Sequence, residues 1–166
     1  MGEWTGITGA ISNVNSLVGT STSDFVGSPG VVALTNGNYV VRSTVWDDGA
    51  TANVGAVTWG DGTIGISGAV SVSNSLIGTA LNDQVGFPSV LALTNGNYAV
   101  SSFLWDNGAT TNVGAVTWGN GLGGTVGTIS PANSLVGTNL TDQVGNGLVA
   151  LTNGNYVVRS LDWDNG

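Results

Sequence analysis

The chain contains no cysteine, no histidine and no lysine, and its only basic residues are Arg42 and Arg159. Without cysteine there can be no disulfide, no thiolate nucleophile and no cysteine-bound metal. Without histidine and lysine, the commonest general base and most pairs of nucleophile and base are also absent. The sequence therefore predicts a protein that is not an enzyme and that uses no metal or cofactor.

Positive charge is scarce, with two basic residues against ten acidic ones and a formal net charge of -8 at pH 7. This balance disfavours phosphate backbones and anionic membrane surfaces, so neither nucleic acid nor a membrane is an expected partner. No apolar run approaches the roughly 20 residues that a membrane-spanning helix needs.

Charged residues make up 7% of the chain, whereas Gly, Ser, Thr and Asn are abundant. That composition is typical of extracellular bacterial repeat proteins. The N-terminal MGEWTG has neither the basic region nor the apolar run of a signal peptide. We therefore expect this chain to be an internal part of a larger extracellular or cell-surface protein.

The chain is dominated by a tandem repeat with a period of 59 residues. The motif NSL(V/I)GT begins at Asn15, Asn74 and Asn133. LTNGNY recurs in the same register at Leu34 and Leu93, but one residue early at Leu151. Repeats of this size each form one supersecondary unit that stacks on its neighbours. We treat 1–166 as a single repeat domain with copies at 15–73, 74–132 and 133–166, and expect 1–14 to complete the last copy.

Each copy is expected to form four short antiparallel strands and no helix, because short β-branched runs alternate with turn residues. Asn-Gly pairs at 36–37, 95–96 and 153–154 lie between two apolar runs and predict tight hairpins. In the first copy the expected strands are 31–34, 39–46, 54–59 and 75–78. The second of these is apolar at almost every position, so we expect it to be covered on both faces.

Four antiparallel strands with buried middle strands describe one blade of a β-propeller. A β-solenoid is the alternative, although its coils are usually much shorter than this repeat and need no Asn-Gly hairpins. Propellers have about four to eight blades around a channel, so three copies are too few for one ring. We expect a homodimer in which two chains associate head to tail and give six blades.

The order of GNYVV, VGAVTWG and NSLIGTALNDQVG, with Asp-x-x-Gly at 24–27, 83–86 and 142–145, resembles the FG-GAP repeats of integrin alpha-type β-propellers. It is also similar to repeats of large bacterial haemagglutinin-like surface proteins. The resemblance covers the whole chain and implies a propeller with an adhesin-like role. Many FG-GAP repeats hold calcium in an aspartate-rich loop between the first two strands. Here that connection is TNGN, so the calcium site is not carried over.

Tryptophans beside acidic or amide residues are the candidate ligand-binding groups. An exposed indole offers a ring face for a sugar, and neighbouring polar atoms can bond its hydroxyls. The alternative is that the tryptophans fill the wedge between blades. The candidates are Trp46 with Asp47, Trp105 with Asp106, Trp163 with Asp164, and, before a Gly-Asp-Gly or Gly-Asn-Gly turn, Trp59 and Trp118.

Paired carboxylates could in principle act as in a glycosidase, and Asp47 with Asp48 or Asp24 with Asp83 are the nominal pairs. The aspartates recur at fixed places in every copy, however, which favours the capping of turns. The sequence predicts a non-enzymatic module that binds glycan or another protein through its loops. The alternatives are a structural or self-assembling repeat without a ligand and, more remotely, a carboxylate-dependent glycosidase.

Overall fold

The computed structural model describes residues 6–164, and over these residues the chain forms thirteen short strands and no helix. This confirms the expected all-β class. No described segment is a helix that is long and apolar enough to cross a bilayer.

The first sheet has five strands: a two-residue strand pairs in parallel at one edge, and the other four are antiparallel. Across the sheet these are β2 (Pro29–Ala33), β3 (Tyr39–Ser43), β4 (Ala56–Gly60) and β6 (Ser75–Ile77). The Asn-Gly hairpin joins β2 to β3, and Gly37 at its tip has a φ of 91°, which favours glycine. β3 is shorter than expected, because the Trp46 N–H bonds back to the Ser43 carbonyl and closes a turn.

The second sheet repeats the four antiparallel strands of the first. Its strands are β7 (Val90–Ala92), β8 (Tyr98–Ser102), β9 (Ala115–Gly119) and β11 (Ser134–Val136), again all antiparallel. The third sheet consists of the hairpin β12 (Gly147–Ala150) and β13 (Tyr156–Arg159). The described residues 6–14 add no strand to this hairpin, so the completion of the last copy by residues 1–14 does not occur within one chain over that range.

Two short parallel pairs connect successive copies, and the sequence did not predict them. β1 (Leu17–Val18) pairs with β5 (Gly68–Ala69), and β6 pairs with β10 (Gly127–Thr128). Gly68 and Gly127 have φ angles of 105° and 101°, a region open chiefly to glycine. Because β6 lies in the first sheet and β10 follows β9, the second pair ties the two sheets together.

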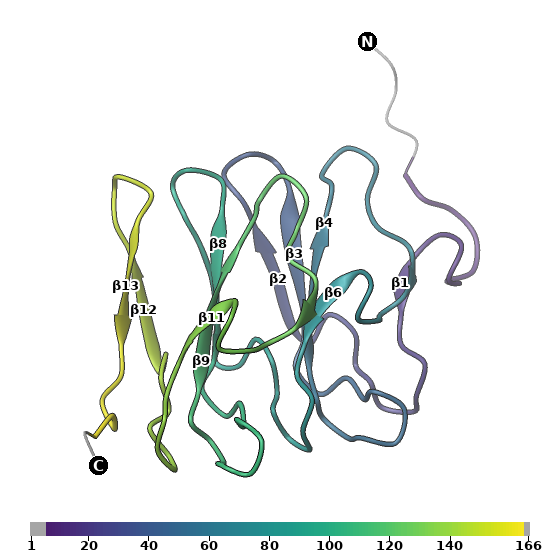
Figure 1. Ribbon diagram of the computed structural model, residues 1–166. Helices are drawn as coiled ribbons and strands as arrows, with labels where there is room; N and C mark the ends of the chain where they lie inside the picture. The colour runs from purple at the N-terminus through teal and green to yellow at the C-terminus, as the bar shows by residue number, and fades with distance from the viewer. Residues whose placement is uncertain (1–5, 165–166) are drawn as a thin grey trace.

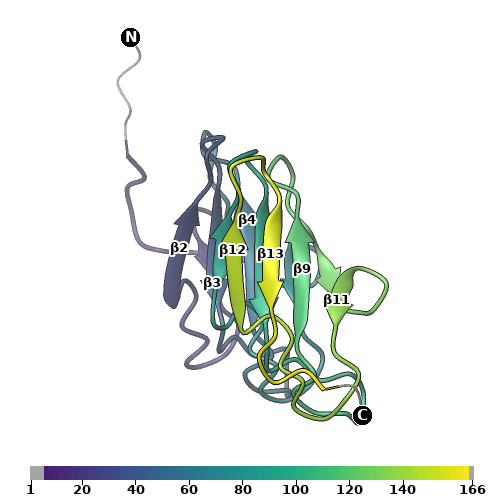
Figure 2. The same cartoon turned by 90° about the vertical axis from the view of Figure 1, so that its left-hand side faces the viewer.

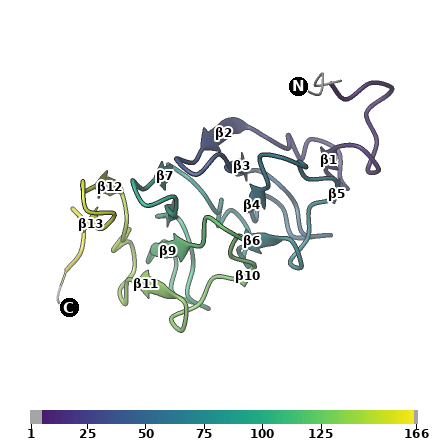
Figure 3. The same ribbon diagram turned by 90° about the horizontal axis from the view of Figure 1, so that it is seen from above.

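The three sheets lie face to face in a row, and the described chain begins at one end of that row and finishes at the other (Figure 1). Seen along the row, the sheets overlap (Figure 2). Neighbouring sheets contact each other along β2, β7 and β12, and in Figure 3 they diverge toward β6 and β11. The row is therefore tapered, narrow along the first strand of each sheet and wide along the last.

The core lies between the sheets. Val40 of the first sheet belongs to the same buried apolar cluster as Val90, Tyr98 and Val100 of the second, and the half-buried Val32 packs against that cluster. All five residues of β8 are buried, which confirms the expectation that the second strand is covered on both faces. β13 instead alternates between half-buried and exposed residues, because only one of its faces is covered.

We predict that Val100→Ala lowers the free energy of unfolding by about 2–3 kcal/mol, since Val100 is fully buried and its truncation leaves a cavity. The same truncation at Val72, which is half exposed and outside the sheets, is the control and is expected to change it by less than about 0.5 kcal/mol. Chemical denaturation measures both. Equal losses at the two sites would contradict a core between the sheets.

Candidate functional site

Three recurring aspartates organise the loop that follows each NSL(V/I)GT motif. The buried Asp83 accepts hydrogen bonds at Oδ2 from the backbone N–H groups of Thr79 (2.7 Å) and Ala80 (2.8 Å). Its Oδ1 accepts a third from the Asp106 N–H (2.9 Å). Asp24 and Asp142 make the equivalent three bonds in their own copies. The turn-capping interpretation is thus confirmed, and the nominal pair Asp24 and Asp83 serves two separate turns.

The surroundings of these carboxylates differ along the row. Burial raises the pKa of Asp83, and the N–H groups of Ala80 and Thr79 act against that rise. In the last copy, the hydrogen bond from the Asn139 N–H is the main cause of a lowered pKa at Asp142. The folded state therefore favours the charged form of Asp142, and the stability that this contributes is lost as the pH falls through its folded pKa.

Asp47 and Asp106 brace the loops that follow the buried tryptophans. Asp47 Oδ1 accepts from the Asn53 N–H (2.8 Å), and Asp106 Oδ1 accepts from the Asn112 N–H (2.7 Å). In the last copy, Asp164 Oδ1 accepts from Asn139 Nδ2 at 2.9 Å. Each of these carboxylates, which the sequence predicted to bind a ligand, therefore accepts a hydrogen bond from a residue of its own copy.

Trp46, Trp105 and Trp163, the first set of predicted ligand-binding tryptophans, differ in how far they are exposed to solvent. Trp46 and Trp105 are each 3% exposed and belong to the two apolar clusters. Their Nε1 atoms find no acceptor among the described residues. Trp163, the third member, is 54% exposed. Neither face of the Trp46 or Trp105 ring is open to a sugar, and the alternative role of filling the space between sheets accounts for both.

Trp59 and Trp118, the second set, also differ in their exposure to solvent. Trp59 is half-buried and donates its Nε1–H to the Gly121 carbonyl (3.0 Å), so the loop after β9 covers it. Trp118, at the same place in the second sheet, is 46% exposed. It lines a hollow of about 540 Å³ together with Asn95, Asn97, Leu151, Gly154, Asn155 and Tyr156.

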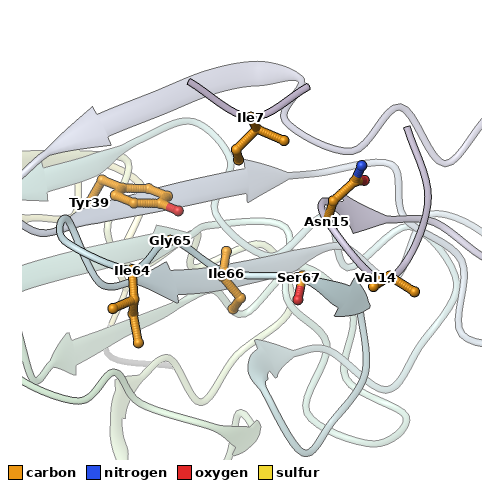
Figure 4. A pocket seen from close by; sticks show the side chains of 8 residues that line it. All are labelled: Ile7, Val14, Asn15, Tyr39, Ile64, Gly65, Ile66 and Ser67. Atoms are coloured by element: carbon orange, nitrogen blue, oxygen red, sulfur yellow. The ribbon is translucent and has the colours of Figure 1, made fainter. Parts of the chain in front are cut away.

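A second hollow, of about 390 Å³, lies beside the first sheet (Figure 4). Tyr39 and the segment 64–67 line it, with Ile7, Val14 and Asn15 opposite. Gly65 here occupies the repeat position of Gly124, the glycine against which Trp59 packs. The hollow beside Tyr39 thus lies on the outer side of the first sheet, whereas the hollow beside Trp118 lies between the second sheet and the β12–β13 hairpin.

A ladder of hydrogen bonds joins the hairpin tips, and sequence reasoning missed it. Thr35 Oγ1 donates to the Leu93 carbonyl (3.3 Å), and Asn36 Nδ2 donates to the Gly96 carbonyl (3.2 Å). Thr94 and Asn95 repeat these bonds to the third sheet, on the carbonyls of Leu151 and Gly154. The signal was present in TNGN, which also predicted the hairpins, because its Thr and Asn recur unchanged in every copy.

A third connection between neighbouring copies is made by the side chain of Arg42 on β3 and by its equivalent on β8. Arg42 donates from Nε to the Gly86 carbonyl (3.1 Å) and from Nη2 to the Pro88 carbonyl (2.6 Å). At the same position in the second sheet, Ser101 donates from Oγ to the carbonyl of Gly145. The ladder and this connection join neighbouring copies, whereas the turn caps hold the loops within each copy. The described residues contain no group of three or more acidic side chains that could hold a metal ion.

We predict that Asp83→Ala lowers the free energy of unfolding by about 3 kcal/mol, because three backbone N–H groups lose the acceptor that the buried Asp83 carboxylate supplies. Asp83→Asn keeps one acceptor oxygen and should lose less. The control is Asp48→Ala, since Asp48 is exposed and its carboxylate makes no hydrogen bond within residues 6–164; we expect a change below about 0.5 kcal/mol. Thermal or urea unfolding of the three variants checks this order.

Comparison with known proteins assigns the repeat to a family. The chain matches a family described as a repeat of unknown function (DUF5650) over residues 2–28, 33–87, 92–146 and 150–166. No curated protein and no solved structure matches it. Each complete match begins at the end of one sheet's first strand and extends through the turn capped by Asp83 or Asp142. Since these segments span nearly the whole chain, it belongs to the DUF5650 repeat family.

Proposed function

We propose that this chain is a non-enzymatic structural module, a scaffold whose copies join face to face within a larger bacterial surface protein. The observation that carries the proposal is where the recurring polar side chains are used. Thr35, Asn36 and Arg42 bond to the neighbouring copy, and Asp24 and Asp47 bond to their own loops. These side chains thus either join one copy to the next or hold the loops of their own copy in place.

The architecture proposed for the assembled scaffold is a β-propeller with four-stranded blades. Two observations support it over a β-solenoid. The long pairings of each sheet are antiparallel, whereas successive coils of a solenoid pair in parallel, and the two parallel pairings here each span only two residues. The row also tapers toward β2, β7 and β12 (Figure 3), as blades do toward a central channel.

Lengthening the row tests the scaffold proposal. A chain with a second copy of residues 15–73 inserted between Ser73 and Asn74 gains one sheet and one junction, and it keeps Arg42 opposite a proline-containing loop at both junctions. Because the stability of repeat proteins is close to a sum of unit and interface terms, we expect it to unfold cooperatively at a higher temperature than the parent chain. A control insertion of the same segment in scrambled order should not. A lower melting temperature, or loss of the β-sheet circular dichroism, would count against the scaffold.

A second candidate function is glycan binding at the hollow beside Trp118. The half-exposed indole lies among the amides of Asn95, Asn97 and Asn155 and the hydroxyl of Tyr156, and a ring face flanked by polar groups suits a sugar. The scaffold remains the main proposal because Trp59, the equivalent residue inside the row, is covered by the following copy.

The two candidate functions predict different results in a glycan-array screen followed by a tryptophan-fluorescence titration. Glycan binding predicts a hit whose affinity falls about tenfold or more in Trp118→Ala, since aromatic contact is worth at least about 1.4 kcal/mol in a binding site. The matched control is Trp163→Ala, because Trp163 is equally exposed but does not line the hollow. The scaffold predicts no specific hit.

A further inference from the structure

We propose that two copies of this chain associate head to tail, and that Arg159 of one copy sets the register by donating to the carbonyls of Gly27 and Pro29 of the other. This inference rests on the scaffold function proposed above and names its partner. It concerns two surfaces: the last face, on β12 and β13, which carries Val149, Val157 and Arg159, and the first face, on β2 and β3, which carries Val31 and Tyr39.

The last face presents the donors that the inner sheets use. Thr152 and Asn153 occupy the positions of Thr35 and Asn36, but their hydroxyl and amide nitrogen have no acceptor within residues 6–164. The Arg159 side chain, at the position of Arg42, likewise has none there. These three donors occupy the repeat positions of the side chains that join the first sheet to the second, and the Arg159 guanidinium, which lies over Gly147 of its own hairpin, would turn outward on docking.

The first face presents the matching acceptors. The ladder bonds end on the carbonyls of Leu93 and Gly96 in the second sheet, and the corresponding carbonyls of the first sheet belong to Leu34 and Gly37. No side chain within residues 6–164 donates to either. A copy seated on this face would therefore bond Thr152 to Leu34 and Asn153 to Gly37, and continue the same ladder.

At the first junction an arginine faces a loop that contains proline, and at the second a serine faces a loop without it. This correspondence indicates which copy Arg159 fits. Arg42 faces the Phe87-Pro88 loop and bonds Gly86 and Pro88. Ser101 faces the third copy, where the loop has lost its proline and one residue, and its shorter side chain bonds Gly145 alone. Arg159 is again an arginine, so it fits a copy with the longer, proline-containing loop. The first face has that loop, Ser28-Pro29, with Gly27 at the position of Gly86.

The apolar parts of the two faces also correspond. Val149 and Val157 are 57% and 48% exposed on the last face, and Val31 is 59% exposed on the first. At the inner junction the equivalents of Val157 and Val31 are Val40 and Val90, which are 0% and 7% exposed. Head-to-tail docking would bury these side chains as the inner junction does, and removing such patches from water drives association.

The contact joins two different faces, so it is heterologous, and it forms a ring where the rotation closes and a filament where it does not. The taper of the row favours closure. Two chains supply six copies, within the range of about four to eight blades for propellers. Because each chain carries a net charge of -8, added salt should strengthen the association by screening repulsion.

The test is the mass of the 166-residue chain in solution, measured by light scattering and sedimentation over a range of concentrations. We expect twice the monomer mass of 16.5 kDa. Arg159→Glu places a carboxylate against carbonyl oxygens and should raise the dissociation constant about tenfold or more. Arg159→Lys keeps one donor and should have a smaller effect. Because Arg159 is exposed in the single chain, circular dichroism and the melting temperature of dilute samples should not change.

A mixing experiment distinguishes head-to-tail from symmetric pairing. Val31→Asp disables the first face and Arg159→Glu disables the last face, so each variant alone should be a monomer. In a mixture, the intact last face of the Val31→Asp chain can dock on the intact first face of the Arg159→Glu chain, and dimers should return. A symmetric interface that used only one face would not be rescued.

A wild-type chain that stays monomeric at the highest concentration would overturn this inference and leave the lengthening experiment to decide the scaffold function separately. Dimers that persist in both single variants, or a mixture that stays monomeric, would also overturn it. Failure of the lengthened chain alongside a normal wild-type dimer would instead reject the scaffold and keep the contact.

Discussion

Burial of the middle strand on both faces is the constraint from which the rest of the structure follows. Val40 and Val41 point to opposite faces of the first sheet and are both buried, as are Ala99 and Val100 in the second. A single sheet has nothing to cover two apolar faces, so each sheet needs a neighbour on either side. The row of sheets meets that requirement for the second sheet, which lies between the first and the third.

Close packing restricts the residues at the points of contact, both between paired strands of one sheet and between copies. The Tyr98 ring lies over Gly119, and Tyr39 lies over Gly60, where any Cβ would overlap the ring. Gly114, which has a φ of 76°, approaches the backbone of Gln143 and Val144 as closely. The recurrence of glycine in VGAVTWG therefore has a packing cause at both ends of the motif.

Several parts of this arrangement were predictable from the sequence, because they depend on neighbours along the chain. The apolar runs and Asn-Gly turns located the four strands, and the recurring Asp-x-x-Gly located the capped turns. The two-residue strands β5 and β10 were not predictable, since a Gly-Ala or Gly-Thr pair has no strand signal until another copy lies beside it. The same holds for the tryptophans. Trp59 and Trp118 lie in identical local sequences, and their exposure differs only because a loop of the next copy covers Trp59.

The junctions are similar without being interchangeable, and this follows from a compensation between side-chain length and loop length. A long Arg42 spans to the carbonyls of Gly86 and Pro88, whereas the shorter Ser101 bonds only Gly145, in a loop that has lost one residue. Either change alone would leave a buried donor without an acceptor or bring the guanidinium against the shortened loop, and each is costly in a buried contact. Because the two changes occur at the same junction, each copy fits the neighbour that follows it better than it would fit the other. A repeat protein can in this way fix the order of nearly identical units, using one polar position per sheet while the apolar faces remain common to all.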